Sequence, residues 1–271
     1  MINRLAVILI GQYRTWPVCS KYLLNFFNGK AHNVDYFFVT WDTTQIWRTK
    51  YSALKWHKQR LPVQESDIVK YFDSTSNLVK CSVLPDIAHW HSYYRMAYLS
   101  HEANKLKQQH EQALNFVYDQ VVETRPDLYI RPFADNPAWD FCNDLEYAGS
   151  PIYPHVSSGE EILIMGDLYL RSNSKTNDIL SQRMYHCNEL PAGTSPHGQG
   201  HHRLLVDYIL QNNIQIVNKN RHYGNSPELE ECGHFDNSTD YSFAMPIRSL
   251  DLIDIDLDAV PAKKLFELNP Y

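Results

Sequence analysis

The sequence has few glycines and fewer basic than acidic residues. Each of these features argues against one class of function. Only 10 of the 271 residues are glycine, whereas glycine usually makes up about 7% of a protein. A fold that depends on several glycine-rich phosphate-binding loops is therefore disfavoured. The formal net charge of −6 argues against nucleic-acid binding, which usually shows as a basic excess.

Paired cysteines and long hydrophobic runs are also missing. The five cysteines include no CxxC pair, which is typical of reduced thiols, so we expect a cytoplasmic protein. No apolar run approaches the roughly 18 residues that a transmembrane helix needs, so we expect no membrane span. The opening segment MINRLAVILIGQYR lacks the apolar length and the cleavage site of a signal peptide, and it is typical of a buried first strand.

Hydrophobic periodicity indicates an α/β fold. Apolar runs predict strands at 5–10, 34–40, 80–84 and 116–123, and spacings of three and four residues predict helices at 18–27 and 92–114. Strands that alternate with helices are typical of a mainly parallel sheet flanked by helices. The later part of the chain predicts a strand at 161–165, a helix capped by Asn173 or Ser174, a helix around 204–209 and a strand at 214–217. We expect one domain spanning 1–271.

Polar residues follow three of the predicted strands at the points where they end. Gly11-Gln12-Tyr13-Arg14 follows the first strand, Trp41-Asp42 the second, and Arg125-Pro126-Asp127 the fourth. Ligands of open parallel sheets bind beyond the carboxyl ends of the strands. The pattern favours a polar binding crevice at this edge, over the alternative of ordinary loop polarity with an internal Arg–Asp pair.

These residues carry a resemblance to a known group of enzymes. The segments LIGQYRTW, VDYFFVTWD, SYYRMAYLSHEANKLKQQHEQ and YDQVVETRPDLYI resemble small glycosyltransferases of the GT-A type that share G-Q-x-R and R-P-D elements. The resemblance covers about the first 130 residues. The chain departs from the pattern at Ile10, at Glu123 and in the segment SPHGQGHHRLL.

The resemblance implies a Rossmann-like GT-A fold that binds a nucleotide-sugar donor. Residues 1–131 would form the donor-binding half, and 132–271 the acceptor-side half with the C-terminal tail. A divalent cation, Mn or Mg, would neutralise the diphosphate, with Asp127 as its ligand. Arg125 stands where an Asp-x-Asp motif needs its other carboxylate. Arg125 could therefore supply the positive charge instead of a metal. The donor-binding residues implied are Gly11, Gln12, Arg14, Asp42, Tyr94, Arg125 and Asp127.

The acceptor side is expected to bind a hydroxyl-bearing molecule, most simply a glycan. Asp167 follows a predicted strand and is the candidate general base for the attacking hydroxyl, although Gly166-Asp167 is also a turn signal. The resemblance and the position of the residues suggest Trp41, His201 and His202 on the acceptor side.

Two other functions remain open from the sequence. The same fold could bind a nucleotide sugar without catalysing transfer, since the Asp-x-Asp motif is missing. A metal-dependent hydrolase is less favoured. His197 and His201 would share one face of a helix and could bind a metal, but their spacing matches no known zinc framework.

Two segments invite other interpretations. Residues 43–64 contain five Lys or Arg and two Trp but no acidic residue. Helical spacing predicts a helix with an aromatic buried face here, with nucleic-acid or acceptor contact as alternatives. The tail segment SLDLIDIDLD contains two Asp-x-Asp matches, but its alternation predicts an edge strand with exposed carboxylates.

Overall fold

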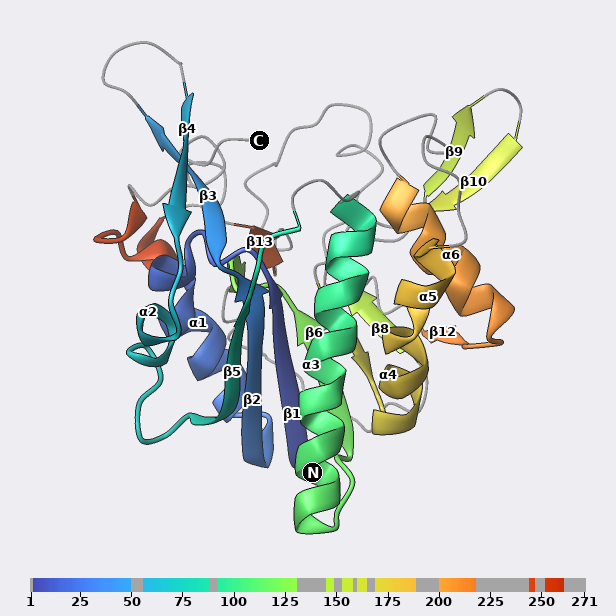
Figure 1. Cartoon of the computed structure of the whole chain (residues 1–271), viewed down its shortest axis with the longest axis horizontal. Helices are drawn as coiled ribbons and strands as arrows, with labels where there is room; N and C mark the ends of the chain where they lie inside the picture. The colour runs from blue at the N-terminus through green and yellow to red at the C-terminus, as the bar shows by residue number, and fades with distance from the viewer. Residues whose placement is uncertain are drawn as a thin grey trace.

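A seven-stranded, mainly parallel sheet forms the centre of the protein (Figure 1). The computed structural model describes residues 2–49, 56–87, 92–130, 145–148, 153–157, 160–164, 169–188, 200–217, 244–246 and 252–260. The strands occur in the order β12-β8-β11-β6-β1-β2-β5. Their bounds are β1 Ile2–Gly11, β2 Ala31–Trp41, β5 Asn77–Leu84, β6 Gln120–Thr124, β8 Leu145–Ala148, β11 Tyr169–Ser172 and β12 Ile216–Val217.

Four neighbouring strands, β6, β1, β2 and β5, run parallel to one another. Strand β11 is antiparallel to both β6 and β8, and β12 is parallel to β8. The predicted α/β class with a mainly parallel sheet is therefore confirmed. Six further strands form three two-stranded sheets: β3 Thr43–Thr49 with β4 Trp56–Pro62, β9 Tyr153–Ser157 with β10 Glu160–Ile164, and β7 Leu128–Ile130 with β13 Ala244–Pro246.

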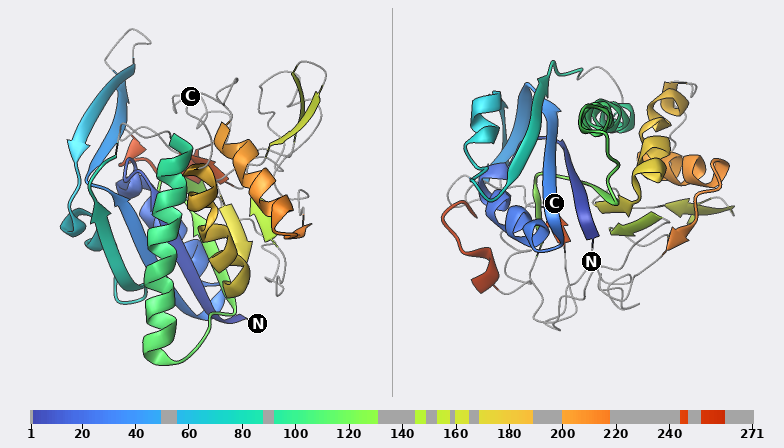
Figure 2. Two further views of the ribbon diagram at one scale, coloured as in Figure 1. Left: turned by 45° about the vertical axis from the view of Figure 1, so that its right-hand side comes forward. Right: turned by 90° about the horizontal axis from the view of Figure 1, so that it is seen from below.

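Helices cover both faces of the sheet (Figure 2). Helix α1 (Trp16–Asn28) packs on one face and α3 (Ser92–Leu114) on the other. Strand β1 is buried on both sides because alternate residues point to opposite faces: Leu5, Val7 and Leu9 lie in the core under α1, whereas Ala6, Ile8 and Ile10 lie in the core under α3. The remaining helices are α2 Glu65–Val69, α4 Ser174–Ser181, α5 Arg183–Asn188, α6 Gly200–Gln211 and the 3-10 helix η3 Leu257–Ala259.

The order of the strands places a topological switch point between β1 and β6. The chain moves outward from β1 to β2 and β5, then returns along α3 to β6 on the other side of β1. Neighbouring strand ends diverge at such a point and leave a crevice beyond their carboxyl ends. The segments that follow β1 and β6 contain the G-Q-x-R and R-P-D elements.

A layer of buried charged and polar side chains separates α3 from α4 and α5. The Lys107 side chain is fully buried, and its Nζ lies 3.1 Å from Glu111 Oε2 and 3.0 Å from Asp178 Oδ1. Nearer the start of α3, buried Glu123 accepts hydrogen bonds from Ser100 Oγ and Arg183 Nη2. We call Lys107, Glu111 and Asp178 the lysine cluster.

Most of the predicted elements are confirmed, some with shifted ends. Helix α3 has the predicted bounds, and the side chain of Asn173 caps α4 by accepting a hydrogen bond of 2.8 Å from Thr176 N. The predicted strand at 116–123 begins only at Gln120. Asn115, with φ +50°, ends α3, and Asp119 Oδ2 accepts hydrogen bonds from the backbone N–H groups of Asn3 and Arg4.

Two predicted elements are wrong. Residues 43–49 and 56–62 form the antiparallel strands β3 and β4 instead of a helix, since TTQIWRT is rich in β-branched and aromatic residues, which favour strands. The tail residues 252–260 form turns and η3 instead of an edge strand. There Leu252 and Leu257 enter the core, while Asp256 caps η3 by accepting a hydrogen bond from Asp258 N.

Candidate functional site

The Asp127 carboxylate lies between two guanidinium groups at the carboxyl ends of β1 and β6. Arg125 binds it through two bonds of 2.8 Å, from Nε to Oδ1 and from Nη2 to Oδ2. Arg14 Nη1 lies 3.2 Å from Asp127 Oδ2. Only 2% of the Asp127 side chain is exposed, compared with 20% for Arg14 and 18% for Arg125. Two partly exposed cations therefore enclose one buried anion, and we call Arg14, Arg125 and Asp127 the arginine cluster.

The backbone that positions Arg14 is strained. Arg14 has φ +27°, a conformation that residues other than glycine rarely adopt. It is held by a hydrogen bond of 2.8 Å from Arg14 N to Thr44 Oγ1 and by one of 2.9 Å from Arg14 Nε to Gln12 Oε1. Strain of this kind persists where the surrounding structure enforces it, and it concentrates at functional sites.

Gly11 ends β1 in a conformation that a side chain would disfavour. Its φ is +127°, and its carbonyl accepts a hydrogen bond of 2.7 Å from Thr40 Oγ1. A Cβ added there would lie 3.7 Å from Pro126 Cδ, which is ordinary contact. The requirement for glycine therefore comes from the backbone angle.

The N-terminus of α1 adjoins the arginine cluster but offers little to an anion. The N–H groups of Trp16, Val18 and Cys19 all donate to carbonyls of Tyr13 or Thr15. Pro17, in the first turn, has no N–H. An anion at this edge would therefore have to be bound by arginine side chains and not by the N–H groups of this helix end.

The Cys19 thiol is chemically quiet. Burial raises the pKa of Cys19 well above its usual range, and the negative charge of Asp127 raises it further. A neutral thiol is a poor nucleophile and a poor metal ligand. Cys19 is therefore a packing residue beneath the arginine cluster.

A second group of charges lies at the ends of β2 and β5. The Asp86 carboxylate accepts hydrogen bonds from Arg95 Nη2, from Arg60 Nη2 at 2.9 Å and from Thr43 Oγ1 at 2.8 Å. Asp42 is exposed, and its Oδ1 accepts a hydrogen bond of 2.9 Å from Asp86 N. Asp42 thus joins the ends of two neighbouring strands, and its predicted donor contact stays a prediction.

Two aromatic residues of the predicted site are buried. Trp41 is 2% exposed and stacks on Tyr98 at 6.1 Å, with the Arg95 guanidinium 5.4 Å from its ring centroid. Tyr94 is 9% exposed and packs in a small core with Met184. These positions suit side chains that support the crevice floor. Direct contacts of Trp41 with an acceptor and of Tyr94 with a donor stay predictions.

Several predicted residues cannot be placed around this edge. Asp167 and His197 lie outside the described residues. His201 and His202 lie in the first turn of α6, and the structure describes the position of their backbone alone. Within the described ranges, no group of three His, Cys, Asp or Glu residues could hold a metal ion.

Asp127 does not fit a divalent cation in this arrangement. Arg125 contacts both carboxylate oxygens, and Arg14 contacts Oδ2 as well. A metal ion would have to displace a guanidinium from a carboxylate that is almost fully buried. Arg14 and Arg125 already neutralise the Asp127 carboxylate.

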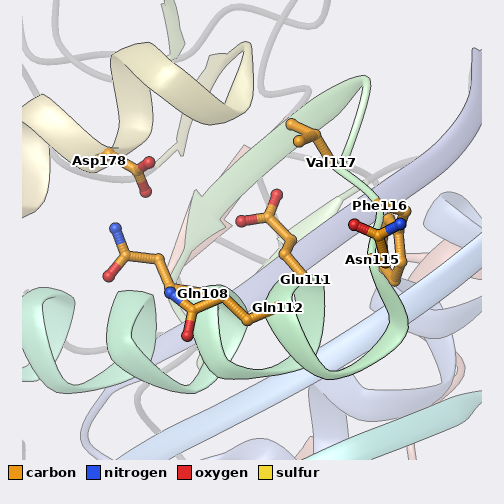
Figure 3. Close-up of a pocket in the computed structure, with 7 residues that line it drawn as sticks. All are labelled: Gln108, Glu111, Gln112, Asn115, Phe116, Val117 and Asp178. Atoms are coloured by element: carbon orange, nitrogen blue, oxygen red, sulfur yellow. The ribbon is translucent and has the colours of Figure 1, made fainter.

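A cavity of about 450 Å³ lies at the opposite edge of the sheet (Figure 3). Figure 3 shows Asp178 projecting from α4 toward the side chains on the last turns of α3. Lys107 already pairs with Glu111 and Asp178 there, and the amino edge of a parallel sheet is not where ligands bind. The carboxyl edge remains the candidate site. The cavity is lined by Gln108, Glu111, Gln112, Asn115, Phe116, Val117 and Asp178.

Sequence reasoning missed the roles of three residues at the carboxyl edge: Thr44, Arg60 and Asp86. Thr44 holds the backbone of Arg14, and Asp86 gathers Arg60 and Arg95. Asp86 follows the predicted strand at 80–84, so the rule that found Asp42 and Asp127 also applies to it. Arg60 and Thr44 could not be found this way, because their segment was expected to be a helix.

Comparison with known proteins adds no relative: no family model matches the sequence, and no curated protein matches it significantly. Within the ranges that the structure describes, no helix is long and apolar enough to cross a membrane. The functional argument therefore depends on the fold and on the residues at the carboxyl edge.

Proposed function

We propose that the protein is a glycosyltransferase of the GT-A type, which transfers a sugar from a nucleoside-diphosphate donor to a hydroxyl group of a glycan. The observation that carries the proposal is the pair of partly exposed guanidinium groups, Arg14 and Arg125, at the switch point between β1 and β6. The resemblance of the first 130 residues to this class supports the same assignment.

The arginine cluster suits the leaving group of this reaction. Sugar transfer releases a nucleoside diphosphate, and the negative charge that develops on it must be stabilised. Arginine binds phosphate oxygens through paired N–H donors and stays charged at any physiological pH. Asp127 orients both guanidinium groups before the donor arrives, so little reorganisation is needed on binding.

We propose further that Arg14 and Arg125 take the place of the divalent metal. The Asp127 oxygens are occupied by these arginines, and the chain lacks a second carboxylate two residues earlier. Donor binding should then be insensitive to Mn and Mg. If a metal-chelating buffer abolishes binding of the nucleoside diphosphate, this part of the proposal is wrong.

On the acceptor side, the proposal keeps Asp167 as the general base, with His201 and His202 near the acceptor. The Asp167→Asn variant should lose transfer and keep nucleotide binding, because an amide cannot accept the proton of the attacking hydroxyl. Normal turnover in this variant would remove Asp167 from the reaction.

The main experiment is a thermal-shift panel of nucleoside diphosphates and nucleotide sugars, each with and without Mn. A ligand at 100 times its Kd stabilises the folded state by about 2.7 kcal/mol, which is a shift of several degrees in Tm for a chain of this size. The controls are nucleoside monophosphates, which lack one of the two phosphates, and the Arg125→Ala variant, which lacks one of the two arginines. Each control removes part of the proposed contact between phosphates and arginines.

The outcomes separate the candidate functions. Stabilisation by one nucleoside diphosphate, with release of it from the matching nucleotide sugar, supports the transferase. Stabilisation without release or transfer identifies a nucleotide-sugar-binding protein on the same fold. Failure of every nucleoside diphosphate to shift Tm would contradict the proposal.

A further inference from the structure

Two buried threonine hydroxyls hold the turn that follows β1, one at each end. On β2, Thr40 Oγ1 donates a hydrogen bond of 2.7 Å to Gly11 O. On β3, Thr44 Oγ1 accepts the hydrogen bond of 2.8 Å from Arg14 N. The exposed fraction is 0% for Thr40 and 1% for Thr44, so water does not compete for either bond. The turn is therefore fixed by residues outside its own sequence.

Arg14 needs such support more than Gly11 does. Gly11 tolerates its φ of +127° because it has no Cβ. Arg14 has a φ of +27° and a long side chain, and a residue of this kind keeps such an angle only where its surroundings enforce it. A change of φ at Arg14 would also change the direction in which its side chain leaves the backbone. The bond to Thr44 therefore helps to set where the Arg14 guanidinium lies.

Thr44 is itself firmly placed. The preceding residue, Thr43, donates a hydrogen bond of 2.8 Å from its Oγ1 to Asp86 Oδ2. One residue earlier, Asp42 N donates a hydrogen bond of 2.7 Å to Leu84 O. These contacts tie the start of β3 to the end of β5 and to the segment that follows it (Figure 1). Thr44 is therefore a fixed point against which the turn after β1 is held.

The two guanidinium groups of the arginine cluster depend on the backbone to different degrees. Arg125 is aligned by two bonds of 2.8 Å from its own guanidinium to Asp127. The contact from Arg14 Nη1 to Asp127 Oδ2 is longer, at 3.2 Å. Arg14 Nε also donates to Gln12 Oε1, but Gln12 belongs to the same turn and would move with it. Loss of the Thr44 bond should therefore displace Arg14 and leave Arg125 in place.

We infer that Thr44 is a positioning residue, which holds Arg14 where its guanidinium binds the diphosphate of the donor. Because only 1% of Thr44 is exposed, it acts through Arg14 and not by contact with the ligand. A group that is held in its bound position before the ligand arrives loses less freedom on binding, which raises affinity. The effect on the diphosphate rests on the proposed function, whereas the hold on the Arg14 backbone does not.

The first measurement needs no ligand. Hydrogen exchange of the Arg14 amide, followed by NMR, reports on the bond from Arg14 N to Thr44 Oγ1. Thr44→Val keeps the shape of the side chain and removes the acceptor, so we expect this exchange to become about tenfold faster or more. Thr44→Ser keeps the hydroxyl and should keep the rate of the parent protein. An unchanged rate in Thr44→Val would overturn the inference.

The second measurement is the affinity of the full chain for UDP, GDP and ADP in titration calorimetry, at a temperature where every variant is folded. Thr44→Val should weaken binding of the nucleoside diphosphate about tenfold, and Thr44→Ser should keep the affinity of the parent protein. The matched control is Ser181→Ala. Ser181 is fully buried, and its hydroxyl accepts a hydrogen bond of 3.0 Å from Asn104 Nδ2 between α4 and α3. Loss of this hydroxyl should leave the affinity unchanged.

A double-mutant cycle separates a positioning role from a general structural role. In Arg14→Ala the guanidinium that Thr44 positions is gone, so adding Thr44→Val should have no further effect on affinity. The same loss in both backgrounds would show that Thr44 supports the whole edge of the sheet, and an equal loss in Thr44→Ser would assign the effect to packing. Either result overturns the inference. If none of the three nucleotides binds the parent protein, the proposed function fails, and the exchange rate of the Arg14 amide still decides whether Thr44 holds Arg14.

Discussion

The arginine cluster and the lysine cluster are both built from ion pairs, yet they lie in different surroundings. Around Asp127 the anion is buried and two cations reach solvent. Around Lys107 the cation is fully buried, and two carboxylates enclose it, with 9% of Glu111 and 35% of Asp178 exposed. One cluster lies at the carboxyl edge of the sheet, and the other lies between helices toward the amino edge.

The difference shows that buried charge alone does not mark a functional site. The lysine cluster holds one buried cation between two carboxylates and joins α3 to α4, as a structural network does. The arginine cluster exposes part of two guanidinium groups, contains the strained backbone of Arg14 and lies at the switch point.

The largest effect is expected from removing the buried cation. Lys107→Met should lower the free energy of unfolding by about 3 kcal/mol, because breaking a buried ion pair leaves its carboxylates without a counter-charge. Urea denaturation measures this loss. Lys105→Met is the control, since its side chain is 50% exposed and a surface change of this kind alters stability by about 0.5 kcal/mol or less.

Nucleotide binding by the same variant sharpens the comparison. At a temperature where Lys107→Met is folded, its affinity for the nucleoside diphosphate should equal that of the parent protein. A loss of affinity without a loss of stability would mean that the lysine cluster belongs to the functional site.

Arg125→Ala should show the opposite pattern. A hydrogen bond to a charged group contributes about 1.5–3 kcal/mol, so affinity for the nucleoside diphosphate should fall roughly 10- to 100-fold in titration calorimetry. Stability should change less than in Lys107→Met, because Arg14 still neutralises Asp127. Unchanged affinity in this variant would show that Arg125 acts only on Asp127.

A smaller effect is expected at the end of β1. Gly11→Ala should lower the free energy of unfolding by about 1–2 kcal/mol, because φ +127° strains a residue with a side chain. Gly29→Ala is the matched control: Gly29 has φ −86° and no atom within 4 Å of an added Cβ. Equal changes in Tm for the two variants would contradict the role assigned to the backbone of Gly11.

The smallest effect is expected in the pH dependence of stability, through His101 on α3. Burial lowers the pKa of His101 on α3 from its usual value of 6.5. The unfolded chain therefore takes up the proton more readily, and the stability that neutral His101 contributes is present above pH 6.5 and lost as pH falls through the lowered pKa. Urea denaturation at pH 7 and pH 5 should show a smaller drop for His101→Gln than for the parent protein. Identical drops would show that other groups cause the pH dependence.

The central sheet was predictable because its strands are buried on both faces. LAVILI is apolar at every position and VDYFFVT is mostly apolar, a pattern typical of an enclosed strand. The same reasoning brought Arg14, Arg125 and Asp127 together, since the ends of parallel strands share one edge. The contacts of Asp127 could not be predicted, because a carboxylate can pair with a guanidinium group or bind a metal ion.

The errors arose where two periodicities fit the same residues. In 43–62, Trp47 and Lys58 match a helical face as well as a pair across a hairpin, and only the pairing of Thr43–Thr49 with Trp56–Pro62 decides between them. In the tail, apolar residues alternate with aspartates as in a strand. The chain instead buries Leu252 and Leu257 against the core that α1 covers, and this distant contact is not visible in the local pattern.

The separation of 113 residues between Arg14 and Asp127 has a consequence for how the protein is made. During synthesis, β1, α1, β2 and β5 are available for pairing long before β6 leaves the ribosome. Contacts between distant residues form late, because closing a long loop must precede them. The arginine cluster can therefore be completed only when β6 docks beside β1, so the proposed affinity for a diphosphate would report that this part of the sheet has assembled.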